Sequence, residues 1–428
     1  MTRRAATLAL GLVVAACSDY QHNPTAPYPP PPPPPSAIDV SFCSGDEPQW
    51  LAFQDGDGAW TRAQPTVAGQ VATYSHTFTS DRGAVATERV QANGFTFLSV
   101  QYGKPAELAI AGDGQTNLCE LPALKTLVGT VAGIGANEVA VVSEGRSTRE
   151  ATTPEEGNEF TLRFVPSGPQ ELLATRLTDT GDDLLLTGYI LRRALDLPDG
   201  ATIPVLDFNS AEVIQPVART VTLAGFGPDG AISGVGFRTA HSDNVTTFGM
   251  SEVVAPARTY YAVPEEKLAP GDIQFISATT SVTVNSNVVR SIHTYFRAPT
   301  TRTLTFPPVP HAPTITVVAT APTARMRARF DAQADYDRAT GVHYQQGQNV
   351  VALNMTAAYA ALNPGGYELT LPEFTGVDGF ETRWALQSGV VTTWQSNRIG
   401  GTLGLMPGLV PVDGDTRVIG FDAGFVTP

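Results

Sequence analysis

The most restrictive feature of the sequence is a succession of short runs in which apolar and polar residues alternate, separated by turns rich in Gly and Pro. Residues 95–102 alternate in this way, and residues 50–54 precede an Asp-Gly-Asp-Gly turn at 55–58 that is typical of a β-hairpin. Residues 357–362 form the best candidate for a short helix, which the following Asn-Pro-Gly-Gly segment ends. The pattern therefore predicts an all-β protein built from tandem β-sandwich domains.

The N-terminus has the organisation of an export signal. Two arginines precede an apolar stretch at 5–16, which matches a signal-peptide core and is too short to span a bilayer. The stretch ends in an aliphatic residue, two small residues and a cysteine: Val14, Ala15, Ala16 and Cys17. This segment resembles the lipobox of bacterial lipoproteins. The resemblance implies that residues 1–16 are removed and that Cys17 carries fatty acyl chains such as palmitate. The alternative is an ordinary secretory signal followed by an incidental cysteine.

Residues 17–37 form a polar linker that contains seven consecutive prolines at 29–35. Such a run adopts the extended polyproline II conformation, which predicts a semi-rigid stalk behind the anchor. The alternative is a ligand for a proline-binding groove. Ser18 is not the aspartate of the enteric inner-membrane retention signal, which favours the outer membrane as the anchored site. No other stretch approaches eighteen apolar residues, so the sequence predicts no transmembrane helix.

Two cysteines remain besides Cys17, and an even pair in an oxidising compartment favours a disulfide between Cys43 and Cys119. The bond would close a loop of about 76 residues and stabilise the fold by roughly 4 to 5 kcal/mol in the chain-entropy model. The alternative is two buried free thiols.

Turn-rich breaks divide the exported chain into four predicted β domains, at 38–122, 123–216, 217–306 and 307–428. The predicted disulfide would join the start of the first domain to its end.

The second unit contains a Gly-Thr-Val strand at 127–133, a Phe-x-Leu strand that runs into a Val-Pro-x-Gly turn at 160–168, and an apolar strand at 171–176. This arrangement resembles the carboxypeptidase regulatory-like family, which implies a transthyretin-like β-sandwich without catalysis of its own. We expect Phe160, Leu162 and Phe164 to lie on one face of their strand.

Charge and motif content argue against several functions. The net charge of -14 and the pI near 4.8 disfavour nucleic-acid binding. The sequence has no Walker loop, no Gly-x-Gly-x-x-Gly segment between a strand and a helix, and no Gly-x-Ser-x-Gly elbow, and its six histidines lack metal-ligand spacing. We therefore predict no cofactor, no metal and no identifiable catalytic residue. The sequence does not decide whether the protein has a carboxylate pair for glycoside hydrolysis, because the two members of such a pair come from distant parts of a chain.

Three arginines, Arg325, Arg327 and Arg329, alternate with apolar residues and predict a basic strand face. This face is a candidate site for an anion such as a phosphate or an acidic glycan. The favoured alternative is a solvated face paired with the aspartates at 331, 335 and 337. The acidic segment at 55–58 has two interpretations, a plain turn and a calcium-binding loop, and the plain turn is favoured.

The four tryptophans, Trp50, Trp60, Trp384 and Trp394, offer two interpretations. They can stack on sugars if they are exposed, but core packing is the default.

Three functions follow from these features. The first is a lipid-anchored, non-catalytic envelope protein that binds a protein, glycan or envelope component. The second is a carbohydrate-active enzyme or a carbohydrate-binding module. The third is a scaffold that joins layers of the envelope.

Overall fold

The structure is a computed structural model that describes residues 35–91, 93–113, 124–144, 148–155, 157–181, 184–227, 230–240, 245–253, 257–282, 288–403 and 410–428. Nearly all of its regular structure is β-strand, which confirms the predicted all-β class. The described helices are α1 (Pro105–Asp113), α2 (Ala357–Leu362) and short 3-10 segments at Glu265–Lys267, Ala334–Tyr336 and Thr382–Trp384. Helix α2 coincides with the predicted helix. Within the described ranges, no helix is both long enough and apolar enough to cross a membrane.

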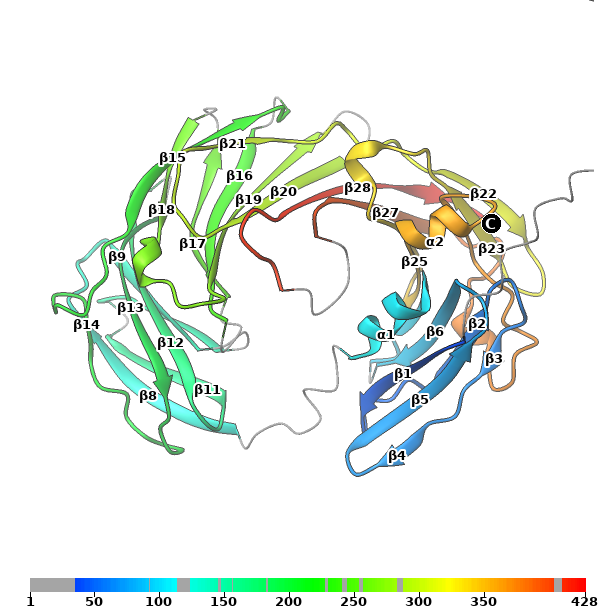
Figure 1. The fold of residues 1–428 in the computed structure, drawn as a ribbon, viewed down its shortest axis with the longest axis horizontal. Coiled ribbons are helices and arrows are strands. Elements are labelled where there is room, and N and C mark those ends of the chain that lie inside the picture. The colour runs from blue at the N-terminus through cyan, green and yellow to red at the C-terminus, as the bar shows by residue number, and fades with distance from the viewer. Residues whose placement is uncertain are drawn as a thin grey trace, which may run out of the picture.

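A sheet of twelve described strands, here called the long sheet, connects the two ends of the molecule (Figure 1). In sheet order its strands are β17 (Val245–Val253), β16 (Ala231–Arg238), β19 (Ile273–Val282), β20 (Val288–Phe296), β28 (Thr416–Val426), β27 (Thr392–Gly401), β24 (Ala339–Gln346), β25 (Asn349–Thr356), β7 (Thr96–Gly103), β6 (Gly83–Val90), β2 (Trp50–Asp55) and β3 (Thr61–Arg62). Neighbouring strands are antiparallel except β7 and β25, which are parallel.

Two small sheets cover opposite faces of the long sheet near β2, and strand β2 shows the reason. Leu51 and Phe53 pack in a core with the sheet β1 (Ser36–Cys43), β5 (Val71–Phe78) and β4 (Thr66–Ala68). Trp50 and Ala52, which alternate with them, belong to a second core on the other face. Because successive side chains of a strand point to opposite faces, four consecutive apolar residues place β2 between two layers.

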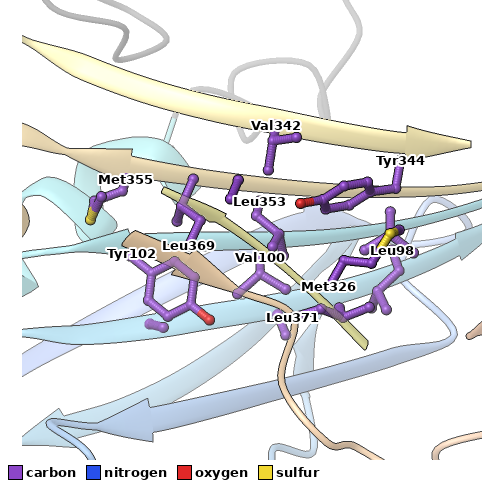
Figure 2. Close-up of a cluster of buried hydrophobic side chains, with 14 of the residues drawn as sticks. Leu98, Val100, Tyr102, Met326, Val342, Tyr344, Leu353, Met355, Leu369 and Leu371 are labelled. Atoms are coloured by element: carbon purple, nitrogen blue, oxygen red, sulfur yellow. The ribbon is translucent and has the colours of Figure 1, made fainter. Parts of the chain in front are cut away.

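The second core is shared with the sheet β22 (Thr314–Ala319), β23 (Arg325–Arg329) and β26 (Glu368–Thr370). Figure 2 shows Val342, Tyr344 and Leu353 of the long sheet beside Met326 and Leu369 of the small sheet. All five are buried, so the two sheets form a β-sandwich.

At the other end of the molecule, two sheets form a separate sandwich (Figure 1). One sheet has the order β10 (Thr148–Thr152), β9 (Glu138–Glu144), β12 (Gln170–Asp179) and β13 (Leu184–Leu195), and the other has β11 (Glu159–Pro166), β8 (Leu124–Ala132) and β14 (Leu206–Asp207). Their facing sides share a buried core that includes Leu127, Leu162 and Leu172. The opposite side of β12 is also buried, since Leu173 packs with Phe237 of the long sheet.

A third small sheet, β18 (Ala257–Ala262), β15 (Val217–Ala224) and β21 (Arg302–Thr305), packs on the long sheet around Leu223, Ile276 and Phe296. Sandwiches therefore follow one another along the chain, as the tandem β-sandwich prediction requires. The long sheet nevertheless contains strands of the first, third and fourth predicted domains, and the pairing of β7 with β25 links the first to the last. The domain boundaries themselves stay predictions.

The expectation that Phe160, Leu162 and Phe164 share one face is wrong at the third position. A β-bulge shifts the register of β11 between Leu162 and Val165. Phe164 takes a φ of 62° and is 65% exposed, whereas Val165 is fully buried. The extra residue turns the phenyl ring to solvent and gives the core position to Val165.

Candidate binding pocket on the long sheet

A pocket of about 440 Å³ lies on the long sheet over strands β24, β25, β27 and β28. This volume falls in the range of roughly 300 to 1,000 Å³ that is typical of small-ligand sites. Its lining residues are His343, Gln345, Val350, Thr393, Trp394, Gln395, Ala423, Gly424 and Phe425.

Strand register explains why these residues meet. Directly paired residues place Val350, Gln345, Thr393 and Phe425 in one row across the four strands. His343, Gln395 and Ala423 form the next row, two residues along each strand, and so share the same face. This face is continuous with the one that the β1-β5-β4 sheet covers near β2.

Trp394 and Gly424 lie between the two rows, so alternation turns their side-chain positions to the opposite face. A Cβ atom at Gly424 would lie 2.6 Å from Cζ2 of Trp394. The indole therefore occupies the space beside Gly424 and packs β27 against β28 beneath the pocket. Trp394 also packs against the second core, as the prediction of core tryptophans expects.

The pocket is polar but carries no charged side chain among the described residues that line it. Gln345, Thr393 and Gln395 are exposed and supply amide and hydroxyl groups. Burial lowers the pKa of His343 below its usual 6.5, so the imidazole is neutral at pH 7. A neutral imidazole donates a hydrogen bond from one nitrogen and accepts one at the other. Hydroxyl and side-chain amide groups likewise both donate and accept hydrogen bonds.

Phe425 adds the one large exposed ring of this lining. It pairs with Thr393 across β27 and β28, and the residue is 77% exposed. A flat apolar ring beside polar groups is a combination that recognises ligands with both an apolar face and hydrogen-bonding groups.

The three arginines of the predicted basic face do not line the pocket. Met326 and Ala328 are fully buried, so their neighbours Arg325, Arg327 and Arg329 point away from the long sheet. Arg325 Nε lies 3.6 Å from Glu373 Oε2 and Arg327 Nε lies 3.2 Å from Glu368 Oε1. These partners are glutamates of β26 and the segment after it, whereas we expected the aspartates at 331, 335 and 337. Anion binding by this face stays a prediction.

The acidic turn after β2 is held by the segment that follows β5. Asp55 accepts hydrogen bonds from the backbone N–H groups of Thr79 and Ser80 and from the Thr79 hydroxyl. Partial burial acts to raise the pKa of Asp55, but these hydrogen bonds lower it to about 2. Asp57 forms an ion pair with Arg82. Across the described parts of the chain, no group of three or more His, Cys, Asp or Glu side chains is placed to hold a metal ion.

The other tryptophans are core residues, as core packing predicts. Trp50 contacts the rings of Phe374 and Phe380, with ring centroids 5.2 Å apart in each case. Trp60 also packs against Phe374, and Trp384 is 2% exposed.

The lipobox residues Val14, Ala15 and Ala16, the anchor Cys17 and the linker up to residue 34 lie outside the described residues. Cys43 ends strand β1, but Cys119 also lies outside them. Lipidation and the Cys43–Cys119 disulfide therefore stay predictions. Sequence reasoning missed the pocket because its residues come from four strands and form no contiguous motif.

Comparisons with known proteins leave the family open. No protein-family model matches the chain, and no curated protein matches it. Among solved structures, the chain is similar to a "putative adhesin" from Bacteroides ovatus, with 8% sequence identity over 44% of this chain and 90% of that one. The TM-score is 0.16, so this likeness carries no argument.

Proposed function

We propose that the protein is a lipid-anchored cell-envelope protein that binds an envelope or extracellular component without catalysis. The lipobox-like segment and the proline run support the anchored location, and the sandwiches supply rigid display modules. The observation that carries the binding role is the uncharged pocket on β24, β25, β27 and β28. Its described lining contains no carboxylate, whereas most glycoside hydrolases need a pair of them.

The anchor is tested by metabolic labelling with radioactive palmitate in a bacterial host. The chain is expected to take up the label, and Cys17→Ala is expected to abolish it together with recovery in the membrane fraction. Ser18→Ala is the matched control and keeps both. A labelled Cys17→Ala variant, or an unlabelled native chain, would refute lipidation at this residue. Protease treatment of intact cells then shows whether the sandwiches face outward.

The binding role is tested by filling the pocket. The full chain in detergent is assayed by biolayer interferometry against outer-membrane vesicles, peptidoglycan sacculi and mucin. We expect Thr393→Trp to weaken binding to at least one of these surfaces by tenfold or more. Thr66→Trp, an exposed threonine on strand β4, is the control and keeps native binding. Equal binding by the native chain and Thr393→Trp on all surfaces would refute a role for the pocket.

A further inference from the structure

We propose that the pocket on the long sheet binds an uncharged saccharide, with a sugar ring stacked on Phe425 and its hydroxyl groups bonded to Gln345, Thr393, Gln395 and His343. This inference rests on the proposed binding function and names the ligand class of the same pocket.

The charge of the lining selects an uncharged ligand. The described lining supplies no arginine or lysine to pair with a phosphate, sulfate or carboxylate, and no acidic group to pair with an amine. The whole chain carries a net charge of -14, which further disfavours acidic ligands.

The hydrogen-bonding groups match hydroxyls. Each side-chain amide has a donor and an acceptor, and so do the threonine hydroxyl and the neutral imidazole. A sugar hydroxyl also donates and accepts, so each of its contacts with such a group can be satisfied in either direction. Gln345 already donates to the carbonyl oxygen of Gly347 at 3.0 Å, which orients its amide at the pocket edge.

The sheet geometry favours a saccharide over an extended peptide. Peptides that add to sheets use the free backbone groups of an edge strand. The pocket instead lies on the face of the sheet, where β24 and β27 are each paired on both sides. A ligand can therefore bond only to side chains at this face. A saccharide has hydroxyl groups around its ring that can form hydrogen bonds with several of these side chains at once.

Phe425 supplies the apolar contact. Phe425 is 77% exposed and pairs directly with Thr393, and the Cβ atoms of such paired residues are about 5 Å apart. One ligand can therefore stack its C–H face on the ring, whose face is electron-rich, and bond its hydroxyls to Thr393 and Gln395. The paired strands hold these groups in place before binding, which limits the entropy lost on association.

The test is isothermal titration of the full chain in detergent with neutral gluco-, manno- and xylo-oligosaccharides, with oligogalacturonate, and with an uncharged Gly-Ser peptide. We expect at least one neutral oligosaccharide to bind. Phe425→Ala should raise its dissociation constant at least tenfold, and Gln395→Ala should raise it severalfold. Phe164→Ala is the matched control, because Phe164 is an exposed phenylalanine outside the pocket lining. Circular dichroism checks that the variants are folded.

Failure to bind any neutral saccharide, preference for oligogalacturonate or the peptide, or native affinity in Phe425→Ala would overturn the inference. The outcomes that refute the proposed binding function differ from those that refute the saccharide inference. If Thr393→Trp weakens binding to envelope surfaces while no neutral saccharide binds, the pocket is a binding site for another ligand class. If Thr393→Trp has no effect on any surface or sugar, both proposals fail.

Discussion

The buried carboxyl group of Glu88 should make the stability of this protein depend on pH. Glu88 lies on strand β6, between Trp50 and Leu98 on the paired strands, and its side chain is fully buried. Its two carboxylate oxygens have no hydrogen bond of ordinary geometry. Burial raises the pKa from the usual 4.5 to about 8, while the Phe97 backbone and the Arg383 charge only partly oppose the change.

The sign of the effect follows from linkage. Above pH 4.5 the unfolded chain releases this proton, whereas the folded chain keeps it until about pH 8. The contribution of Glu88 to stability is therefore most favourable at low pH and becomes less favourable as pH rises from 4.5 to 8. The pKa difference of about 3.5 corresponds to a loss on the order of 3 to 5 kcal/mol over this window, at about 1.4 kcal/mol for each pH unit.

Glu88→Gln keeps the side-chain shape and removes the titration. We expect its free energy of unfolding to exceed that of the native chain by a few kcal/mol at pH 8 and by little at pH 4.5. The measurement is urea unfolding followed by tryptophan fluorescence at pH 4.5, 6 and 8. Glu159→Gln is the control, since this exposed carboxylate is in water in both states. A difference between Glu88→Gln and the native chain that does not grow with pH would refute the reasoning.

Three further variants test packing, pairing and cross-linking. Gly400→Ala should destabilise the fold by about 1 to 3 kcal/mol or more in the same unfolding assay, because its Cβ would lie 1.9 Å from the Asp335 carbonyl oxygen. Arg193→Ala should cost about 3 to 5 kcal/mol, because it removes the ion pair, at 2.5 Å, of the fully buried Asp272. Cys119→Ser should lower stability by roughly 4 to 5 kcal/mol if the predicted disulfide forms.

The structure supplies control variants for Gly400→Ala and Arg193→Ala. Gly376→Ala meets no atom within 4 Å of the new Cβ and should be neutral. Arg383→Ala removes an exposed pair with Glu381 and should cost less than about 1 kcal/mol. Loss of stability in Gly376→Ala, or none in Gly400→Ala or Arg193→Ala, would contradict the packing described above. Two titratable thiols in the unreduced, denatured mature chain would refute the disulfide.

The sequence alone determined the features that depend on neighbouring residues. Alternation predicted the β class and the opposed faces of β23, and the Asn-Pro-Gly-Gly segment predicted where α2 ends. These predictions succeed because side-chain direction and turn conformation are set within a few residues of the chain.

Only the tertiary structure decided which strands lie side by side. Backbone hydrogen bonds between strands are the same for any sequence. Residues 96–103 therefore carry no local pattern that identifies residues 349–356 as their parallel partner. The bulge that exposes Phe164 and the two rows that form the pocket likewise arise from register between strands. Burial of apolar residues on at least one face of each sheet selects that register, and this selection acts between parts of the chain that are distant in sequence.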